Sequence, residues 1–155
     1  MPVFRSTPYH NFNFLVSFPE VSGESAEEEV KAGFAEVSGL SGEVGVAEHR
    51  FGNAKVNYVT KVPGIHKAGD VTLKRGIIGA TNLWEWLDQV RAGSLEGKRN
   101  VTIKLQAEDR SETVVSWKLF GAFPMKLTGP TLNGKGGGDV AMEELTLAVE
   151  HITQE

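Results

Sequence analysis

The 155-residue chain contains no cysteine, which excludes a disulfide framework, a cysteine nucleophile and a thiolate metal site. It also has no apolar run approaching the ~18 residues of a membrane-spanning helix, and the residues after Met1 lack the apolar core of a signal peptide. An excess of positive charge is missing as well. The 16 basic and 20 acidic residues give a net charge of −4, which argues against nucleic acid as the main partner.

Glycine is abundant instead, with 18 residues, and so many glycines in a small acidic chain indicate many turns and therefore many strands. The length is that of one domain, spanning residues 1–155. The apolar fraction of 40% is typical of a globular protein rather than a disordered one. We therefore expect a single strand-rich domain that needs neither metal nor disulfide to fold.

Alternation of apolar and polar residues predicts most of the strands. We expect strands over residues 11–18, 33–38, 43–50, 56–60, 71–75, 101–106, 115–119, 123–128 and 140–152. A turn cluster at 39–42 separates the second strand from the third. Pro63-Gly64 is expected to end the strand that starts at 56, because proline removes a ladder donor. The strand past Gly121 is expected to be bent or bulged, and residues 134–138 to be a hairpin loop rather than a phosphate loop.

One amphipathic helix is predicted over residues 83–92. Leu83, Trp86, Leu87 and Val90 are spaced so that they share one face. Asn82 is placed to cap the first turn, and Gly93 to end the helix in the left-handed conformation. One helix of this length cannot cover a large sheet. The expected fold is therefore mainly β: an antiparallel β-sandwich or barrel with one short α-helix at an end or edge.

No catalytic, cofactor-binding or metal-binding constellation is found in the sequence. The four histidines, at 10, 49, 66 and 151, lack metal-ligand spacing. We interpret the acidic pair Glu143-Glu144, and the basic cluster of Lys67, Lys74 and Arg75, as solvated surface. By elimination the chain is expected to be a structural or binding protein without cofactor, rather than an enzyme.

An ordered series of segments is more specific than any single motif. It comprises Tyr9-His-Asn-Phe-Asn-Phe14, Gly33-Phe-Ala-Glu-Val-Ser-Gly-Leu40, Val46-Ala-Glu-His-Arg-Phe-Gly52, Lys61-Val-Pro-Gly64, Asp70-Val-Thr-Leu-Lys-Arg-Gly76, Leu83-Trp-Glu-Trp-Leu87, Arg99-Asn-Val-Thr-Ile103, Trp117-Lys-Leu-Phe-Gly-Ala-Phe-Pro124 and Asp139-Val-Ala-Met-Glu-Glu-Leu145. From about residue 8 to 152 this series resembles the tail tube proteins of contractile-tailed phages and contractile injection systems. That family is similar to the haemolysin-coregulated tube protein of type VI secretion.

The resemblance implies a tail-tube-like fold and a mechanical role. Six copies would form a ring, and rings would stack into an inner tube within a contractile sheath. The implied partners are other copies of the chain, the sheath protein, the baseplate or spike hub, the tube terminator, and a protein or DNA cargo in the lumen. It also implies assembly in the bacterial cytoplasm, as part of a phage tail or a phage-tail-like particle released by lysis.

Two residue hypotheses accompany this interpretation. The long 51–70 segment is expected to be an arm that reaches an adjacent ring or subunit, with Lys55, Tyr58, Lys61, His66 and Lys67 as its contact residues. The lumen is expected to be lined by the polar alternates Thr102, Lys104, Gln106, Glu144, Thr146 and Glu150. Two alternatives stay open: a tube-initiator paralogue that forms only the first ring or rings at the baseplate, and a monomeric ligand-binding barrel.

Overall fold

Nine strands and one helix are found in the computed structural model, which describes residues 4–18, 33–77, 82–94 and 97–155. Seven strands form one antiparallel sheet in the order β1-β6-β7-β8-β5-β2, with β9 paired to β7, whereas β3 and β4 form a separate hairpin. The elements are β1 (Phe14–Ser17), β2 (Phe34–Ser38), β3 (Gly42–His49), β4 (Thr60–Ala68), β5 (Val71–Gly76), α1 (Asn82–Arg91), β6 (Arg99–Gln106), β7 (Thr113–Thr128), β8 (Met142–Ala148) and β9 (His151–Gln154).

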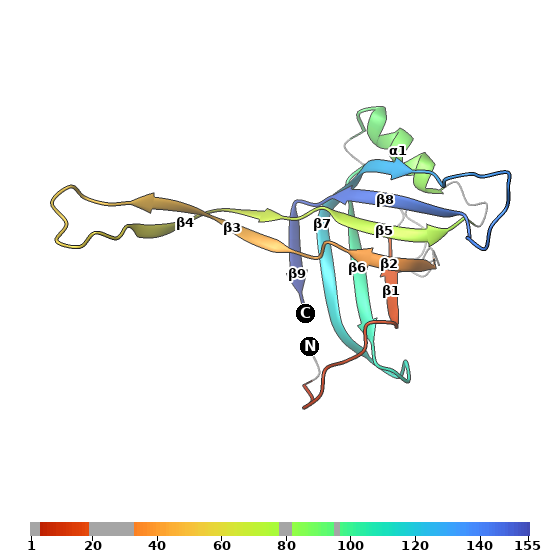
Figure 1. Cartoon of the computed structure of the whole chain (residues 1–155), viewed down its shortest axis with the longest axis horizontal. Coiled ribbons are helices and arrows are strands. Elements are labelled where there is room, and N and C mark those ends of the chain that lie inside the picture. The colour runs from red at the N-terminus through yellow and green to blue at the C-terminus, as the bar shows by residue number, and fades with distance from the viewer. Residues whose placement is uncertain (1–3, 19–32, 78–81, 95–96) are drawn as a thin grey trace.

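The seven-stranded sheet folds over into two layers, one containing β1, β6, β7 and β9 and the other containing β7, β8, β5 and β2. Strand β7 belongs to both layers. Its first part pairs with β6 and β9, and its last part, from Phe123 onward, pairs with β8. Figure 1 shows β6, β7 and β9 running across the direction of β8, β5 and β2, so that the two layers cross steeply. The strand changes course at Gly121, which has a positive φ of 64°. The predicted bend after Gly121 is confirmed.

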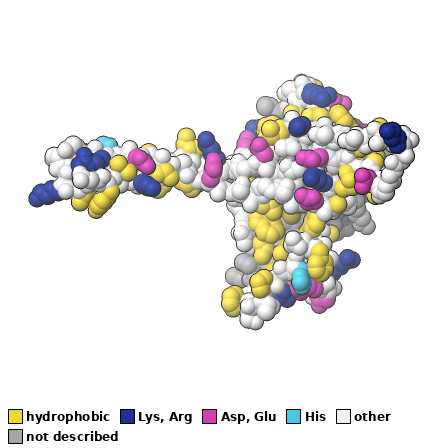
Figure 2. Space-filling view, in the orientation of Figure 1, with side chains coloured by type: hydrophobic (Ala, Val, Ile, Leu, Met, Phe, Trp, Pro, Cys, Tyr) yellow, Lys and Arg dark blue, Asp and Glu magenta, His cyan; other side chains and the backbone are white. Residues whose placement is uncertain are grey.

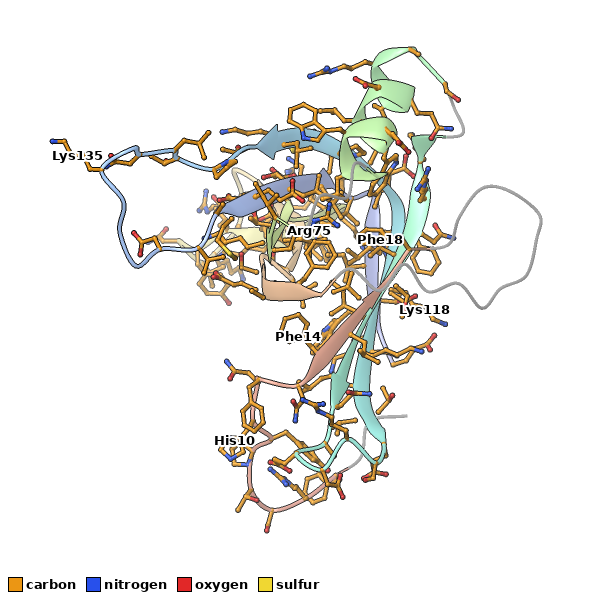
Figure 3. The ribbon with its side chains drawn as sticks, turned by 90° about the vertical axis from the view of Figure 1, so that its right-hand side faces the viewer. His10, Phe14, Phe18, Arg75, Lys118 and Lys135 are labelled. Atoms are coloured by element: carbon orange, nitrogen blue, oxygen red, sulfur yellow. The ribbon has the colours of Figure 1, made fainter. Side chains whose placement is uncertain are left out.

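The core lies between these two layers. The buried side chains of β6 (Val101 and Ile103) face those of β8 (Leu145 and Leu147) within one hydrophobic cluster. The alternation predicted for both strands is therefore confirmed, and so is the mainly β, antiparallel fold with one short helix. Figure 3 shows Phe14 and Arg75 on the interior side of the ribbons, whereas Lys135 stands at the far end of the β7–β8 loop.

Helix α1 covers one end of the two layers (Figure 1). The predicted stripe is confirmed, because Leu83, Trp86 and Leu87 are buried and Val90 packs against the core. The indole Nε1 of Trp86 donates a hydrogen bond to the carbonyl of Gly97 at 2.6 Å. Gly93 ends the helix with a φ of 79°, as expected for a C-terminal glycine.

The strands predicted over 33–38 and 43–50 are confirmed as β2 and β3, which pair with β5 and β4. Two other strand predictions were wrong. Pro63-Gly64 does not end a strand, since β4 begins at Thr60 and runs through both residues to Ala68. The predicted strand over 140–152 is two strands, β8 and β9, which pair with different parts of β7. Alternation identifies faces but leaves the partner of each strand open.

The solvated interpretation of Arg75 and Glu143 was also wrong. The two residues are direct cross-strand partners on β5 and β8, and their side chains are only 2% and 9% exposed. The Nε of Arg75 donates a hydrogen bond to the Glu143 carboxylate, and the guanidinium also lies 5.9 Å from the centroid of the Phe34 ring. The two opposite charges therefore neutralise each other within the buried, otherwise apolar face that β5 and β8 share.

Removing one partner of this pair should lower the free energy of unfolding more than removing both. Arg75→Met leaves a buried carboxylate without its cation, and we expect the free energy of unfolding to fall by about 3–5 kcal/mol. Arg75→Met combined with Glu143→Leu should recover most of that loss, because no buried charge remains. Urea unfolding of the three proteins measures the difference. A double variant no more stable than Arg75→Met would contradict this interpretation.

A second ion pair fastens the N-terminal segment to the turn between β6 and β7. The Arg5 guanidinium donates two hydrogen bonds to the Glu108 carboxylate, at 2.7 and 3.0 Å, and it stacks on Tyr9 at 3.8 Å. The Asn13 amide donates to the Glu108 carbonyl at 3.2 Å. These contacts join residues about a hundred positions apart, so they hold the entry to β1 against the hairpin.

This contact should depend on pH. The hydrogen bonds from Arg5 lower the pKa of Glu108 to about 2. A lowered pKa means that the contact is complete above the ordinary glutamate range of ~4.3 and is lost as the pH falls through about 2. Arg5→Gln should return the pKa of Glu108 toward its ordinary value, as measured by carboxyl-carbon NMR titration. An ordinary Glu108 pKa in the unsubstituted protein would contradict the geometry.

Candidate functional surfaces

The most prominent surface is the β3–β4 hairpin, residues 42–68, which we call the arm. Figure 1 shows it projecting far from the two layers, with only its base next to β9. Its strands are antiparallel and pair from Gly42 with Ala68 at the base to His49 with Thr60 near the tip. The turn beyond is held by Arg50, whose guanidinium donates to the carbonyls of Val56 and Ala54 at 3.0 and 3.2 Å.

A bulge explains how proline fits into the arm. The register shifts between Val44 and Val46, which pair with His66 and Pro63, so β4 carries one more residue than β3 at this point. The backbones approach closely here, and a Cβ on Gly64 would lie 3.1 Å from the carbonyl oxygen of Gly45. Proline needs no ladder partner at a bulge in an edge strand, which is why Pro63 interrupts the register and not the strand.

The structure brings all five predicted arm residues onto this hairpin, and all five are exposed. Lys61, His66 and Lys67 lie on β4, whereas Lys55 and Tyr58 lie in the tip. The sequence interpretation missed the other half of the arm, strand β3, and the apolar character of the whole. Eight exposed large hydrophobic side chains lie on the arm: Val44, Val46, Phe51, Val56, Tyr58, Val59, Val62 and Ile65. Figure 2 shows hydrophobic and charged side chains interspersed along it.

The six predicted lumen residues do not share one surface. Thr102 and Lys104 alternate with the core residues of β6, so they lie on the outer face of the β1-β6-β7-β9 layer. Glu144 and Thr146 alternate with the core residues of β8, so they lie on the outer face of the β7-β8-β5-β2 layer. The shared core separates these two faces. One channel wall can therefore contain only one of the two pairs.

The other two residues lie at strand ends. Gln106 follows a register shift and pairs with Thr113 next to the β6–β7 turn. Glu150 lies between β8 and β9, where its carboxylate binds the Lys98 ammonium at 2.5 Å. The same carboxylate occupies the space that a side chain on Gly121 would need. Glu150 is therefore placed to support the bend of β7.

The outer face of the β7-β8-β5-β2 layer carries two cross-strand rows. One row contains Ser38, Thr72, Thr146 and Lys126, and the other contains Glu36, Lys74, Glu144 and Thr128. In the second row each charge stands beside its opposite, and the Lys74 ammonium lies 3.9 Å from the Glu36 carboxylate. This face is therefore hydrophilic and nearly neutral.

An open apolar groove of about 460 Å³ lies where β1 and β2, the two ends of the strand order, approach each other. Its lining includes Phe12, Phe14, Leu40, Leu105 and Trp117. A smaller hollow of about 160 Å³ lies between the base of the arm and the chain around His151. In the described ranges, no group of three or more histidine, aspartate or glutamate side chains is placed to hold a metal ion. The described helix α1 is too short and too polar to cross a membrane.

Comparison with known proteins agrees with this architecture. The model of the T4-like virus tail tube protein gp19 family matches residues 10–153. The tube–sheath complex of the extracellular contractile injection system PVC, in its extended state, contains a similar chain. Its TM-score is 0.80 at 28% identity, over 97% of this chain and 93% of that one. A chain in the tube-terminating cap of the anti-feeding prophage, AFP, has a TM-score of 0.80 at 26% identity, over 100% and 95%.

A type six secretion system protein has the same fold at lower similarity, with a TM-score of 0.55 and 14% identity over 93% of this chain and 83% of that one. No curated protein matches the sequence. The family match covers nearly the whole chain, and the similar PVC chain is a component of an injection-system tube complex. The chain belongs to the T4-like virus tail tube protein gp19 family, and its role is that of a structural tube protein of a contractile injection system.

Proposed function

We propose that six copies of this chain form a ring and that the rings stack into the inner tube of a contractile particle. Two similar chains come from structures of a PVC sheath–tube complex and of a six-fold symmetrised AFP baseplate. Identities of 28% to both make the same kind of assembly the best-supported function here. The protein acts mechanically in this proposal and catalyses no reaction.

The proposal that rings stack rests on the exposed arm. A two-stranded hairpin is at best marginally stable in water by itself, and this one projects away from its own core with exposed valines at 44, 46 and 62. Exposed apolar surface of this kind marks an interaction site. Repeating contacts that do not close on themselves would build a filament of rings. The arm therefore supplies the ring-to-ring contact.

The further partners in this proposal are the sheath protein, the baseplate or spike hub, the tube terminator, and a protein or DNA cargo in the lumen. Similar chains in the PVC terminator complex and the AFP baseplate, at 27% and 28% identity, support the first three. Assembly takes place in the bacterial cytoplasm, and lysis releases the particle. A tube-initiator paralogue would share the fold, but it would occur in only one or two rings per particle.

Shortening the arm should separate folding from stacking. Replacing residues 45–65 with Asn-Gly keeps the pairs at the arm base and closes them with a two-residue turn. The shortened protein should still unfold cooperatively at a melting temperature close to that of the full chain, but it should form no tubes by negative-stain microscopy, because the stacking contact is lost. The matched control shortens the β7–β8 loop at residues 132–138, which is also exposed.

Two outcomes would be decisive. Tubes of normal length from the arm-shortened protein would overturn the role given to the arm. Failure of the full-length protein to form rings or tubes, together with a monomeric mass in solution, would overturn the proposed function as a whole and favour a monomeric binding barrel.

We further propose that the outer face of the β7-β8-β5-β2 layer is the channel wall. Small hydroxyl side chains and compensated charges make this face hydrophilic without a strong electrostatic field. Cargo of either charge that moves through the channel would therefore not bind tightly to the wall. The opposite face carries Lys104 and Lys118, of which Lys118 pairs with Glu155 at 3.0 Å. Of the predicted lumen residues, this proposal keeps Glu144 and Thr146 in the channel.

The absence of cysteine makes this assignment directly measurable. Thr146→Cys and Thr102→Cys each introduce a single thiol, and intact tubes are treated with a small maleimide or with a maleimide attached to a folded carrier protein. Thr146→Cys should react with the small reagent alone, because a carrier protein cannot diffuse along the lumen. Reaction of Thr146→Cys, but not Thr102→Cys, with the carrier would reverse the assignment of the two faces.

A further inference from the structure

The β7–β8 loop, residues 129–141, contains the only Asn-Gly pair in the sequence, Asn133-Gly134. Glycine has no side chain, so its main-chain nitrogen is the least hindered nucleophile that can follow an asparagine. The other six asparagines precede residues that carry a side chain: Asn11, Asn13, Asn53, Asn57, Asn82 and Asn100. Asn133 is therefore the asparagine most open to attack by its own main chain, and neither the proposed channel wall nor the arm includes it.

The side chain of Asn133 is folded over the peptide that follows it. Its Oδ1 accepts a hydrogen bond from the main-chain N–H of Lys135 at 3.0 Å, which is the contact of an Asx turn. The ring that this hydrogen bond closes contains the Gly134 nitrogen. The turn therefore holds that nitrogen and the amide carbon Cγ of Asn133 together before any reaction begins.

The same hydrogen bond also favours attack on Cγ. Negative charge develops on Oδ1 when a nucleophile adds to the amide carbon of Asn133, and the Lys135 N–H already donates to that oxygen. A donor in this position stabilises the developing charge as an oxyanion hole does. The turn therefore supplies both proximity and charge stabilisation.

Space and water are available around this turn. All residues from 131 to 141 are exposed, and the loop lies at the end of the molecule opposite the arm (Figure 1). A Cβ built on Gly134, Gly136, Gly137 or Gly138 would meet no atom within 4 Å apart from the adjoining residues. The main chain can therefore change shape here with little loss of contact, as the closing of a ring requires.

We propose that Asn133 deamidates in the folded protein through a cyclic imide. A base in solution removes the amide proton of Gly134, and the nitrogen attacks Cγ of Asn133. The N–Cγ bond forms, the Cγ–Nδ2 bond breaks, and Nδ2 takes up a proton and leaves as ammonia. Water then opens the imide at Cγ to give aspartate at position 133, or at the main-chain carbonyl to give isoaspartate. Water is the only co-reactant, and nothing is oxidised or reduced.

The conversion changes the charge of the loop and, in isoaspartate, its length. The net charge of −4 becomes −5, because a carboxylate replaces a neutral amide. Isoaspartate also inserts the Cβ carbon into the main chain. Water does not restore the amide, so converted chains accumulate as the protein ages. The new carboxylate joins Lys135 and Asp139 in the same exposed loop.

The test follows position 133 in the full-length protein at neutral and mildly alkaline pH. Peptide mapping by mass spectrometry separates the amide, aspartate and isoaspartate forms, and the other six asparagines are internal standards. The folded protein should convert Asn133 at least as fast as the same chain in denaturant, because the native turn already holds the reacting groups together. The rate should rise with pH, because the nucleophile forms by loss of a proton.

Two glycine variants test the nucleophile. Gly134→Ala should slow the conversion roughly tenfold, or about 1.4 kcal/mol in the barrier, because the added methyl group hinders the attacking nitrogen. Gly137→Ala is the matched control, since it adds the same group to the same loop in open space, and it should leave the rate unchanged. The melting temperatures of the three proteins check that the fold is retained.

Three results would overturn the proposal. Slower conversion in the folded protein than in denaturant would mean that the native loop protects Asn133. Conversion of Gly134→Ala at the unsubstituted rate, or an equal slowing in Gly137→Ala, would mean that the Gly134 nitrogen is not the nucleophile. Aspartate without isoaspartate would indicate direct hydrolysis, in which no imide forms. All of these measurements use the subunit alone, so they are independent of the proposed ring and tube.

Discussion

The architecture depends on one strand that serves two layers. Strand β7 is sixteen residues long, and it pairs with β6 and β9 before Gly121 and with β8 after it. A positive φ at that residue turns the strand without breaking it, and the Glu150 carboxylate, held by Lys98, occupies the space a side chain would take. This bend sets the crossing of the layers, and the crossing places the apolar faces of β6 and β8 against each other. It therefore also decides which polar faces point outward.

The alternation along β6 and β8, taken together, determines where the two polar faces of the subunit lie. Each strand has one buried side and one polar side, and because the buried sides meet in one core, the polar sides lie on opposite surfaces of the subunit. A subunit with two polar faces, placed in a ring, can present one inward and one outward. In the ring that we propose, the same core would support a hydrophilic channel wall and a hydrophilic exterior, and the contacts between copies would lie at edges and projections.

Sequence reasoning succeeded where a pattern is local. The Leu83–Trp86–Leu87 stripe, the glycine that ends the helix, and the buried alternates of β6 and β8 follow from spacing alone. It failed where the answer depends on a partner far along the chain. Residues 43–50 pair across a long turn with a strand that contains Pro63, and the bulge that admits this proline has no local signature. Arg75 and Glu143 are charged and lie in strands, yet only their pairing explains why both are buried. The length of the 51–70 segment and its lysines led to the prediction of an arm, and all five predicted residues lie on the projecting hairpin, but strand β3 and the many exposed apolar side chains were missed.

The arm shows why assembly and folding are linked in a protein of this kind. Its two strands are hydrogen-bonded to each other, so its direction is set before any partner arrives, but no core of its own supports it. Acids and bases stand opposite each other along its strands, so bringing it into an interface adds little electrostatic repulsion, and the gain comes from covering valines and aromatic rings. Such a contact is non-directional in its energy, and the geometry must come from the rigid base where β3 and β4 continue from the layered core. In the tube that we propose, the subunit would orient the contact and the exposed side chains of the arm would provide the binding energy.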